Sequence, residues 1–188
     1  MKKLAILASG SGTNAENITR YFSNNETIQV VVVLSNKKDA GVHERVKPFG
    51  IPSYTFSNKE FAEGELILST LKEYEVNFIV LAGFLAKIPQ VLLDVYPNQI
   101  INIHPALLPK FGGKGMYGMK VHEAVVANHE AITGITIHYI DEQYDEGTII
   151  FQATCPVLPD ETPEEVAAKV HILEYEHFPK VIEKLLIE

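Results

Sequence analysis

The first half of the chain alternates short apolar runs with longer amphipathic segments. Four short runs are rich in aliphatic residues and predict buried strands of a parallel sheet; they lie at residues 4–8, 28–34, 78–82 and 99–104. The run at 28–34, with four valines in a row, predicts a strand buried on both faces, and residues 51–56 are a further candidate for a short strand. The longer segments carry apolar residues at helical spacing; they lie at residues 13–24, 39–49, 57–74 and 88–96. This alternation predicts an α/β fold, a single domain with an open, mostly parallel sheet flanked by helices.

The second half changes character after residue 104. Residues 105–119 are rich in proline and glycine and predict a long loop, and such a loop inside a compact domain is usually functional. A helix is expected at 120–128. Two further strands, at 132–140 and 148–155, are close enough in sequence to form an antiparallel hairpin.

Two helix starts can be placed from their capping signals. Ser57 is followed three residues later by Glu60, which is the pattern of a capping box. Thr162 is followed by Pro163 and Glu165, which combines an N-cap, a proline at the first helical position and a glutamate at the third. We expect the final helix to be kinked or broken at Pro179, because proline lacks the N–H that a helix interior uses.

Composition narrows the class of protein. The chain has 188 residues, with 24 acidic against 16 basic residues and a net charge of −8, so a basic face for nucleic acid is not expected. One cysteine, Cys155, excludes a disulfide framework and a four-cysteine zinc site. The N-terminal apolar run is shorter than a secretory signal requires, and no run is long enough to span a bilayer. We therefore expect a cytoplasmic protein that binds neither membrane nor nucleic acid.

A glycine-rich turn follows the first predicted strand. Residues 9–15 read Ser-Gly-Ser-Gly-Thr-Asn-Ala and open the first helix, whose N–H groups favour an anion such as phosphate. The spacing also fits the dinucleotide fingerprint, but the second strand ends in Ser35, Asn36 and Lys37 without the acid that holds a ribose. A phosphate or mononucleotide site is favoured over NAD, and a plain strand-to-helix turn is the alternative.

Polar residues at two later places are candidates for catalysis. Asn102 and His104 lie two apart on one strand and therefore project from the same face, where an amide and an imidazole can stabilise a developing oxyanion. The loop at 141–147 holds four acidic residues, and a carboxylate there can pair with an imidazole and raise its pKa; a solvated acidic loop is the alternative. The other six histidines are expected to be structural or on the surface. No motif predicts a metal site.

Five stretches together resemble one family. They are residues 7–14 (Leu-Ala-Ser-Gly-Ser-Gly-Thr-Asn), 35–37 (Ser-Asn-Lys), 81–84 (Leu-Ala-Gly-Phe), 102–111 (Asn-Ile-His-Pro-Ala-Leu-Leu-Pro-Lys-Phe) and 145–150 (Asp-Glu-Gly-Thr-Ile-Ile). The chain resembles the folate-dependent formyltransferases, and among them the phosphoribosylglycinamide formyltransferases. We expect it to lack the added domains of the methionyl-tRNA formyltransferases and of the formyltetrahydrofolate deformylases.

The resemblance implies a formyl transfer from 10-formyltetrahydrofolate, a co-substrate, to the amine of 5-phosphoribosylglycinamide. It implies three catalytic residues, Asn102, His104 and Asp145, with Asp145 keeping His104 cationic. The residues implied for the ribonucleotide are Gly12, Thr13, Asn14 and Glu174. The residues implied for the folate are Lys59, Leu85, Ala86, Lys87, Ile88 and Asn102. Family members often have Met-Arg where this chain has Leu85-Ala86, so Lys87 or Lys59 is expected to replace the arginine contact.

The resemblance also suggests which part of the chain holds each ligand. We expect residues 1–100 to hold the ribonucleotide phosphate and residues 101–188 to hold the folate and the catalytic groups. A formyltetrahydrofolate deformylase, which uses water as acceptor, is the alternative enzyme, and a folate- or nucleotide-binding sensor is the non-enzymatic alternative. The oligomeric state stays open, with a homodimer as one candidate.

Overall fold

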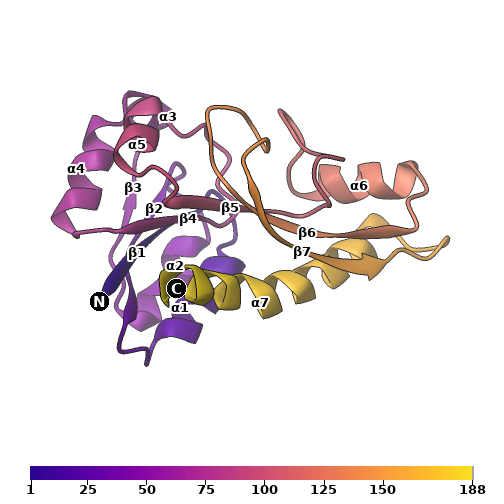
Figure 1. Cartoon of the computed structure of the whole chain (residues 1–188), viewed down its shortest axis with the longest axis horizontal. Helices are drawn as coiled ribbons and strands as arrows, with labels where there is room; N and C mark the ends of the chain where they lie inside the picture. Colours follow the sequence, from indigo (N-terminus) through magenta and orange to yellow (C-terminus); the bar gives the residue numbers. More distant parts are fainter. Residues whose placement is uncertain (188) are drawn as a thin grey trace.

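The computed structural model describes residues 1–187. Seven strands form one sheet (Figure 1): β1 (Lys2–Leu7), β2 (Ile28–Ser35), β3 (Ser53–Thr55), β4 (Phe78–Leu81), β5 (Ile100–His104), β6 (Ile132–Tyr139) and β7 (Ile149–Pro156). The helices between them are α1 (Thr13–Phe22), α2 (Val42–Val46), the short 3₁₀ helix η1 (Lys47–Phe49), α3 (Asn58–Glu63), α4 (Glu65–Glu73), α5 (Gln90–Val95), α6 (Met119–Ala127) and α7 (Pro163–Ile187).

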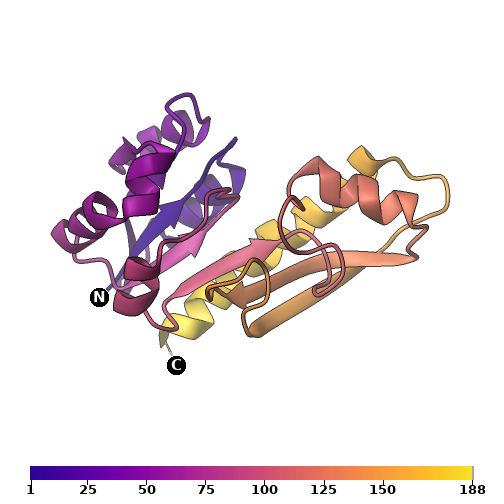
Figure 2. The same cartoon turned by 90° about the horizontal axis from the view of Figure 1, so that it is seen from above.

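The order of strands across the sheet is β3-β2-β1-β4-β5-β6-β7. The first five are parallel to their neighbours, and β6 and β7 continue the sheet as an antiparallel hairpin. The predicted fold class, including the hairpin, is therefore confirmed. The long ribbon of β6 and β7 extends away from the parallel part, and α7 runs along both (Figure 2).

Each face of the parallel strands has its own core. Alternate residues of β1 show this division: Leu4 and Ile6 pack with α1, α2 and α7, whereas Ala5 and Leu7 pack with α3, α4 and α5. Figure 1 shows these two groups of helices on opposite sides of the sheet. A strand buried on both faces has no polar positions to alternate, which explains the continuous apolar runs in the sequence.

One predicted helix is two helices in the structure. The segment expected at 57–74 divides at Gly64, which has φ 78° and ends α3 in the left-handed conformation that favours glycine. A Cβ at this position would lie 2.4 Å from Val91 Cγ1, so packing against α5 also requires glycine. The capping box predicted for Ser57 and Glu60 is present. The prediction of a single helix was wrong because it gave the glycine no weight.

The expected break at Pro179 is absent, since α7 is continuous through this residue. Proline leaves the carbonyl four residues earlier, that of Tyr175, without its helical donor. Asn17 Nδ2 of α1 donates to this carbonyl at 3.0 Å. The contact between α1 and α7 therefore compensates for the missing bond, and this compensation cannot be read from the local sequence.

The caps of α7 follow the sequence prediction. Thr162 Oγ1 accepts from the Glu165 N–H at 3.2 Å, and a Glu165 carboxylate oxygen accepts from the Thr162 N–H at 2.9 Å. Among residues 1–187, no helix is long and apolar enough to cross a membrane.

Candidate active site

A cavity of about 620 Å³ opens at the carboxyl ends of β1, β4 and β5. Its walls come from the turn after β1, the segment after β4, the end of β5, the long loop before α6, the β6–β7 loop and α7. Open parallel sheets bind ligands at this edge, because connections there diverge and leave a crevice. The geometry therefore makes this cavity the candidate active site.

The turn after β1 is shaped by Gly12. Gly12 has φ 78°, and a Cβ added there would lie 2.4 Å from the Val42 Cα of α2. The first N–H groups of α1 follow it directly, at Thr13 and Asn14, and both residues line the cavity. Such N–H groups have no acceptor within the helix and favour an anion. The turn thus has the geometry of a phosphate-binding loop, and its glycine is required by α2 before any ligand arrives.

We expect Gly12→Ala to reduce stability. The added methyl group meets backbone atoms and forces a left-handed residue, which together cost about 2 kcal/mol or more. For a chain of this length that corresponds to a fall in melting temperature of roughly 4–8 °C. Thermal unfolding measures it, with Gly10→Ala as the matched control, because nothing lies within 4 Å of a Cβ at Gly10. Equal melting temperatures for the two variants would contradict this account.

A buried carboxylate stands next to this loop. Glu174 of α7 is 4% exposed, and its Oε2 accepts from Asn14 Nδ2 at 2.9 Å and from His171 Nδ1 at 2.8 Å. Asn14 Oδ1 is buried without a hydrogen-bond partner. The predicted ribonucleotide residues Asn14 and Glu174 are therefore in direct contact, although 160 residues separate them.

The hydrogen bond to Glu174 raises the pKa of His171 above its ordinary value, against the lowering effect of burial. The pair therefore stabilises the fold below the unfolded pKa of histidine, and this contribution is lost as pH rises through the folded pKa. We expect Glu174→Gln to lower the pKa of His171, measured by NMR titration. Glu176→Gln, an exposed carboxylate on the same helix, is the control and leaves the His171 titration in place. An unchanged titration in Glu174→Gln would contradict the assignment.

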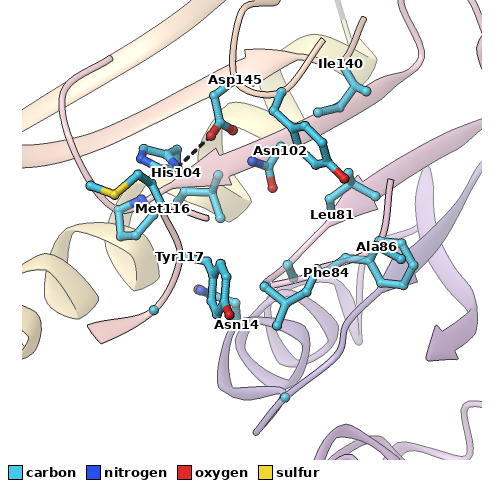
Figure 3. A pocket seen from close by; sticks show the side chains of 18 of the residues that line it. Asn14, Leu81, Phe84, Ala86, Asn102, His104, Met116, Tyr117, Ile140 and Asp145 are labelled. Atoms are coloured by element: carbon cyan, nitrogen blue, oxygen red, sulfur yellow. Dashed lines mark ion pairs between the residues drawn. The ribbon is translucent and has the colours of Figure 1, made fainter. Parts of the chain in front are cut away.

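The three predicted catalytic residues meet on another wall of the cavity. Figure 3 shows Asn102, His104 and Asp145 grouped there, with Asn14 projecting from a different side. His104 Nδ1 lies 3.6 Å from Asp145 Oδ2, while His104 Nε2 donates to the Phe111 carbonyl at 2.7 Å. A carbonyl only accepts, so Nε2 carries the proton of the neutral ring and a second proton would be added at Nδ1, facing Asp145.

His104 is 3% exposed, and burial lowers its pKa below the ordinary value. The charge of Asp145 acts in the opposite direction but does not outweigh burial. The expectation that Asp145 keeps His104 cationic is therefore wrong for this structure. Desolvation disfavours the imidazolium more than one carboxylate at 3.6 Å favours it. The pKa of Asp145 itself is lowered: burial acts to raise it, and the His138 and His104 rings and the Gly113 N–H outweigh that effect.

His138 joins this group and was missed by the sequence analysis. It is fully buried on β6, directly opposite Asn102 in the antiparallel register. Its Nδ1 donates to the Tyr139 carbonyl at 2.9 Å, and its Nε2 lies 3.2 Å from Asn102 Nδ2 and 3.6 Å from Asp145 Oδ1. The signal that was available is the hairpin: a histidine in the strand that precedes the acidic loop.

The segment after β4 forms the apolar part of the cavity. Leu85, Ala86, Lys87 and Ile88 all line it, with Ile88 buried and Leu85 42% exposed.

The loop before α6 faces the cavity through Lys114, Met116 and Tyr117, and the Gly113 N–H donates to Asp145 Oδ2 at 2.9 Å. Asp145 has φ 58°, an uncommon conformation for aspartate, and these contacts hold its carboxylate in place.

A family model described as "Formyl transferase" matches residues 2–182. The chain belongs to the formyl transferase family. It is 38% identical to the phosphoribosylglycinamide formyltransferase of Bacillus subtilis (strain 168), covering 99% of this chain and 95% of that protein. It is 41% identical to the chloroplastic phosphoribosylglycinamide formyltransferase of Arabidopsis thaliana, covering 96% of this chain and 64% of that protein. The chain thus spans less than two thirds of the plant relatives, 64% and 62% of their lengths.

Solved structures agree with the family. The phosphoribosylglycinamide formyltransferase of Anaplasma phagocytophilum superposes with a TM-score of 0.91 at 31% identity, over 100% of this chain and 87% of that one. The enzyme of the same name from Bacillus halodurans gives a TM-score of 0.89 at 36% identity, over 98% of this chain and 95% of that one. The fold of this formyl transferase is therefore that of its named relatives.

The cavity of this formyl transferase unites most of the predicted site residues. Lys59 is the exception: it lies on α3 outside the cavity, its side chain is 85% exposed, and Glu63 is 3.7 Å away. Two histidines expected to be structural, His122 and His171, line the cavity. Burial lowers the pKa of His122, and its Nδ1 has no partner. In the part of the chain described, no group of histidine, cysteine or acidic residues has the arrangement of a metal site.

Proposed function

We propose that this protein is a phosphoribosylglycinamide formyltransferase that uses 10-formyltetrahydrofolate. The observation that carries the proposal is one cavity with two kinds of wall: a phosphate-binding loop at Gly12, Thr13 and Asn14, and a polar group of Asn102, His104 and Asp145. Its relatives of similar length and fold bear this enzyme's name. A phosphate loop suits a phosphorylated acceptor, which favours this enzyme over a deformylase whose acceptor is water.

In the proposed reaction the substrate amine attacks the formyl carbon. A carbon–nitrogen bond forms, the carbonyl electrons move to oxygen, and a tetrahedral oxyanion results. Asn102 Nδ2 carries two hydrogens; one is directed at His138 Nε2, and the other is free to donate to that oxygen. The intermediate then collapses, the bond to the folate nitrogen breaks, and a water carries the proton of the attacking amine to that nitrogen. The products are the formylated amide and tetrahydrofolate.

We propose that His104 takes its second proton from solvent only as negative charge develops beside it, and returns that proton to solvent when the intermediate collapses. Burial keeps the free ring neutral near pH 7, while Asp145 lowers the cost of protonation at Nδ1. The imidazolium so formed lines the cavity and stabilises the oxyanion through its charge, while the Asn102 amide donates to that oxygen.

The decisive test is turnover of 10-formyltetrahydrofolate with and without 5-phosphoribosylglycinamide. We expect tetrahydrofolate to form only in the presence of the ribonucleotide and in equal amount to the formylated product. Turnover that is independent of the ribonucleotide would identify a deformylase, and tight binding of either ligand without turnover would identify a sensor.

We further propose a cytoplasmic location and small-molecule partners only. The relative from Bacillus subtilis supports the location, whereas the plant relatives are named chloroplastic. A homodimer is one candidate oligomeric state, and sedimentation equilibrium of the purified chain distinguishes it from a monomer.

A further inference from the structure

A chain of hydrogen bonds connects the ends of three neighbouring strands. Ser9 Oγ, directly after β1, accepts from the Leu85 N–H at 2.9 Å and donates to Asn36 Oδ1 at 2.5 Å. Asn36 Nδ2, directly after β2, donates to Asn58 Oδ1 of α3 at 2.8 Å. The Leu85 N–H can only donate, so the Ser9 hydroxyl accepts from it and uses its own hydrogen for Asn36.

Ser9 is 2% exposed and holds the segment after β4 at two points. Its N–H donates to the Gly83 carbonyl at 3.0 Å, and its hydroxyl accepts from Leu85 two residues later. Between these contacts Gly83 has φ 73°, so the chain turns there before it enters the cavity. The hydrogen bond from the Leu85 N–H to the Ser9 hydroxyl therefore fixes the position at which residues 85–88 leave the sheet.

Ser9 also immediately precedes the phosphate-binding loop. The two cavity segments therefore meet at one buried side chain: the loop at 10–14 continues from its backbone, and residues 85–88 are attached through its hydroxyl. Asn36, which ends the second strand where a ribose-binding acid would stand in a dinucleotide site, does not line the cavity. Its side chain instead serves as the acceptor that orients the Ser9 hydroxyl.

We propose that Ser9 is a positioning residue for the folate ligand, and that Asn36 acts through it. This inference rests on the proposed function. The Ser9 hydroxyl fixes the Leu85 backbone, so that the apolar wall formed by Leu85, Ala86 and Ile88 is in place before the folate binds. A preformed wall reduces the ordering that binding would otherwise require.

The test measures both Michaelis constants in Ser9→Ala. Removal of the hydroxyl leaves the Leu85 N–H without its acceptor, which we expect to raise KM for 10-formyltetrahydrofolate about 10-fold. KM for the ribonucleotide and kcat should stay close to wild type, because the Ser9 backbone contact to Gly83 remains. Ser9→Thr keeps the hydroxyl and should restore the folate KM.

Two further variants separate this role from a general loss of structure. Asn36→Ala removes the acceptor of the Ser9 hydroxyl and should raise the folate KM to a smaller extent, with the ribonucleotide KM unchanged. Ser35→Ala is the matched control: Ser35 is fully buried at the end of β2, and its hydroxyl accepts from the nearby Lys37 N–H at 3.1 Å. It should leave both Michaelis constants unchanged.

An unchanged folate KM in Ser9→Ala would overturn the inference, and so would an equal rise in both Michaelis constants. If Ser9→Ala does not fold, Asn36→Ala decides by the same criteria. The wild-type protein separates this result from the proposed function: absence of ribonucleotide-dependent transfer in the wild type rejects the function, whereas normal transfer with insensitive variants rejects only the role of Ser9.

Discussion

Asn102→Ala is expected to lower kcat about 100–1,000-fold, the range found when one donor to an oxyanion is removed. The amide donates more strongly to a developing oxyanion than to the neutral formyl oxygen, so its loss falls on the transition state rather than on binding. Steady-state kinetics with both substrates varied measures the effect, and both Michaelis constants should change little.

Asn102→Asp provides the control for shape. It keeps the size of the side chain but replaces the donor with a carboxylate next to Asp145, so its kcat should fall at least as far. Thermal unfolding of each variant checks that β5 is intact. An Asn102→Ala enzyme with wild-type kcat and altered KM alone would reject a role in the transition state.

Asp145→Asn should move the alkaline limb of the pH–rate profile to lower pH. Burial already lowers the pKa of His104, and Asp145 is the largest of the influences that raise it. The variant loses that charge while it keeps the shape, so the pKa of His104 falls further below its reference of about 6.5. A step that needs the imidazolium is available below this pKa and is lost as pH rises through it. The variant is therefore slower near neutral pH and partly recovers in acid.

NMR titration of His104 in both proteins measures the cause directly. The wild-type ring should titrate below the reference value, and the Asp145→Asn ring lower still. If Asp145 only orients a water, the variant will be slower at every pH, with the same alkaline limb and an unchanged His104 titration. That outcome would reject the electrostatic role proposed for Asp145.

The fold was predictable to the extent that it depends on local patterns. Strands buried on both faces appear as short apolar runs, and the capping residues Ser57 and Thr162 marked helix starts that the structure confirms. The two errors in helix continuity have different causes. Gly64 is a local signal, a left-handed C-cap that the prediction gave no weight, whereas the carbonyl left by Pro179 finds a donor on α1, which is a tertiary contact.

The candidate site was predictable where a motif lies in one stretch of sequence. Residues 10–14 of the glycine-rich turn and the pair Asn102 and His104 line the cavity as expected, because the carboxyl ends of neighbouring parallel strands share one edge of the sheet. Lys59 does not line the cavity, because its side chain extends from α3 into solvent. His122 and His171 carry no local signal that distinguishes them from structural histidines, and the one signal for His138 is its place in the strand before the acidic loop.

The sequence by itself therefore determined the α/β class, the glycine-rich turn that opens the first helix and the residues that resemble a formyltransferase. Only the tertiary structure decided which of these side chains contact one another and which charge state His104 adopts. Contacts between residues far apart in the chain place Glu174 against Asn14, His138 between Asn102 and Asp145, and the Ser9 hydroxyl beneath Leu85. The charge state of His104 is also decided by the tertiary structure. It depends on the balance between burial and one carboxylate, and burial is a property of the whole fold.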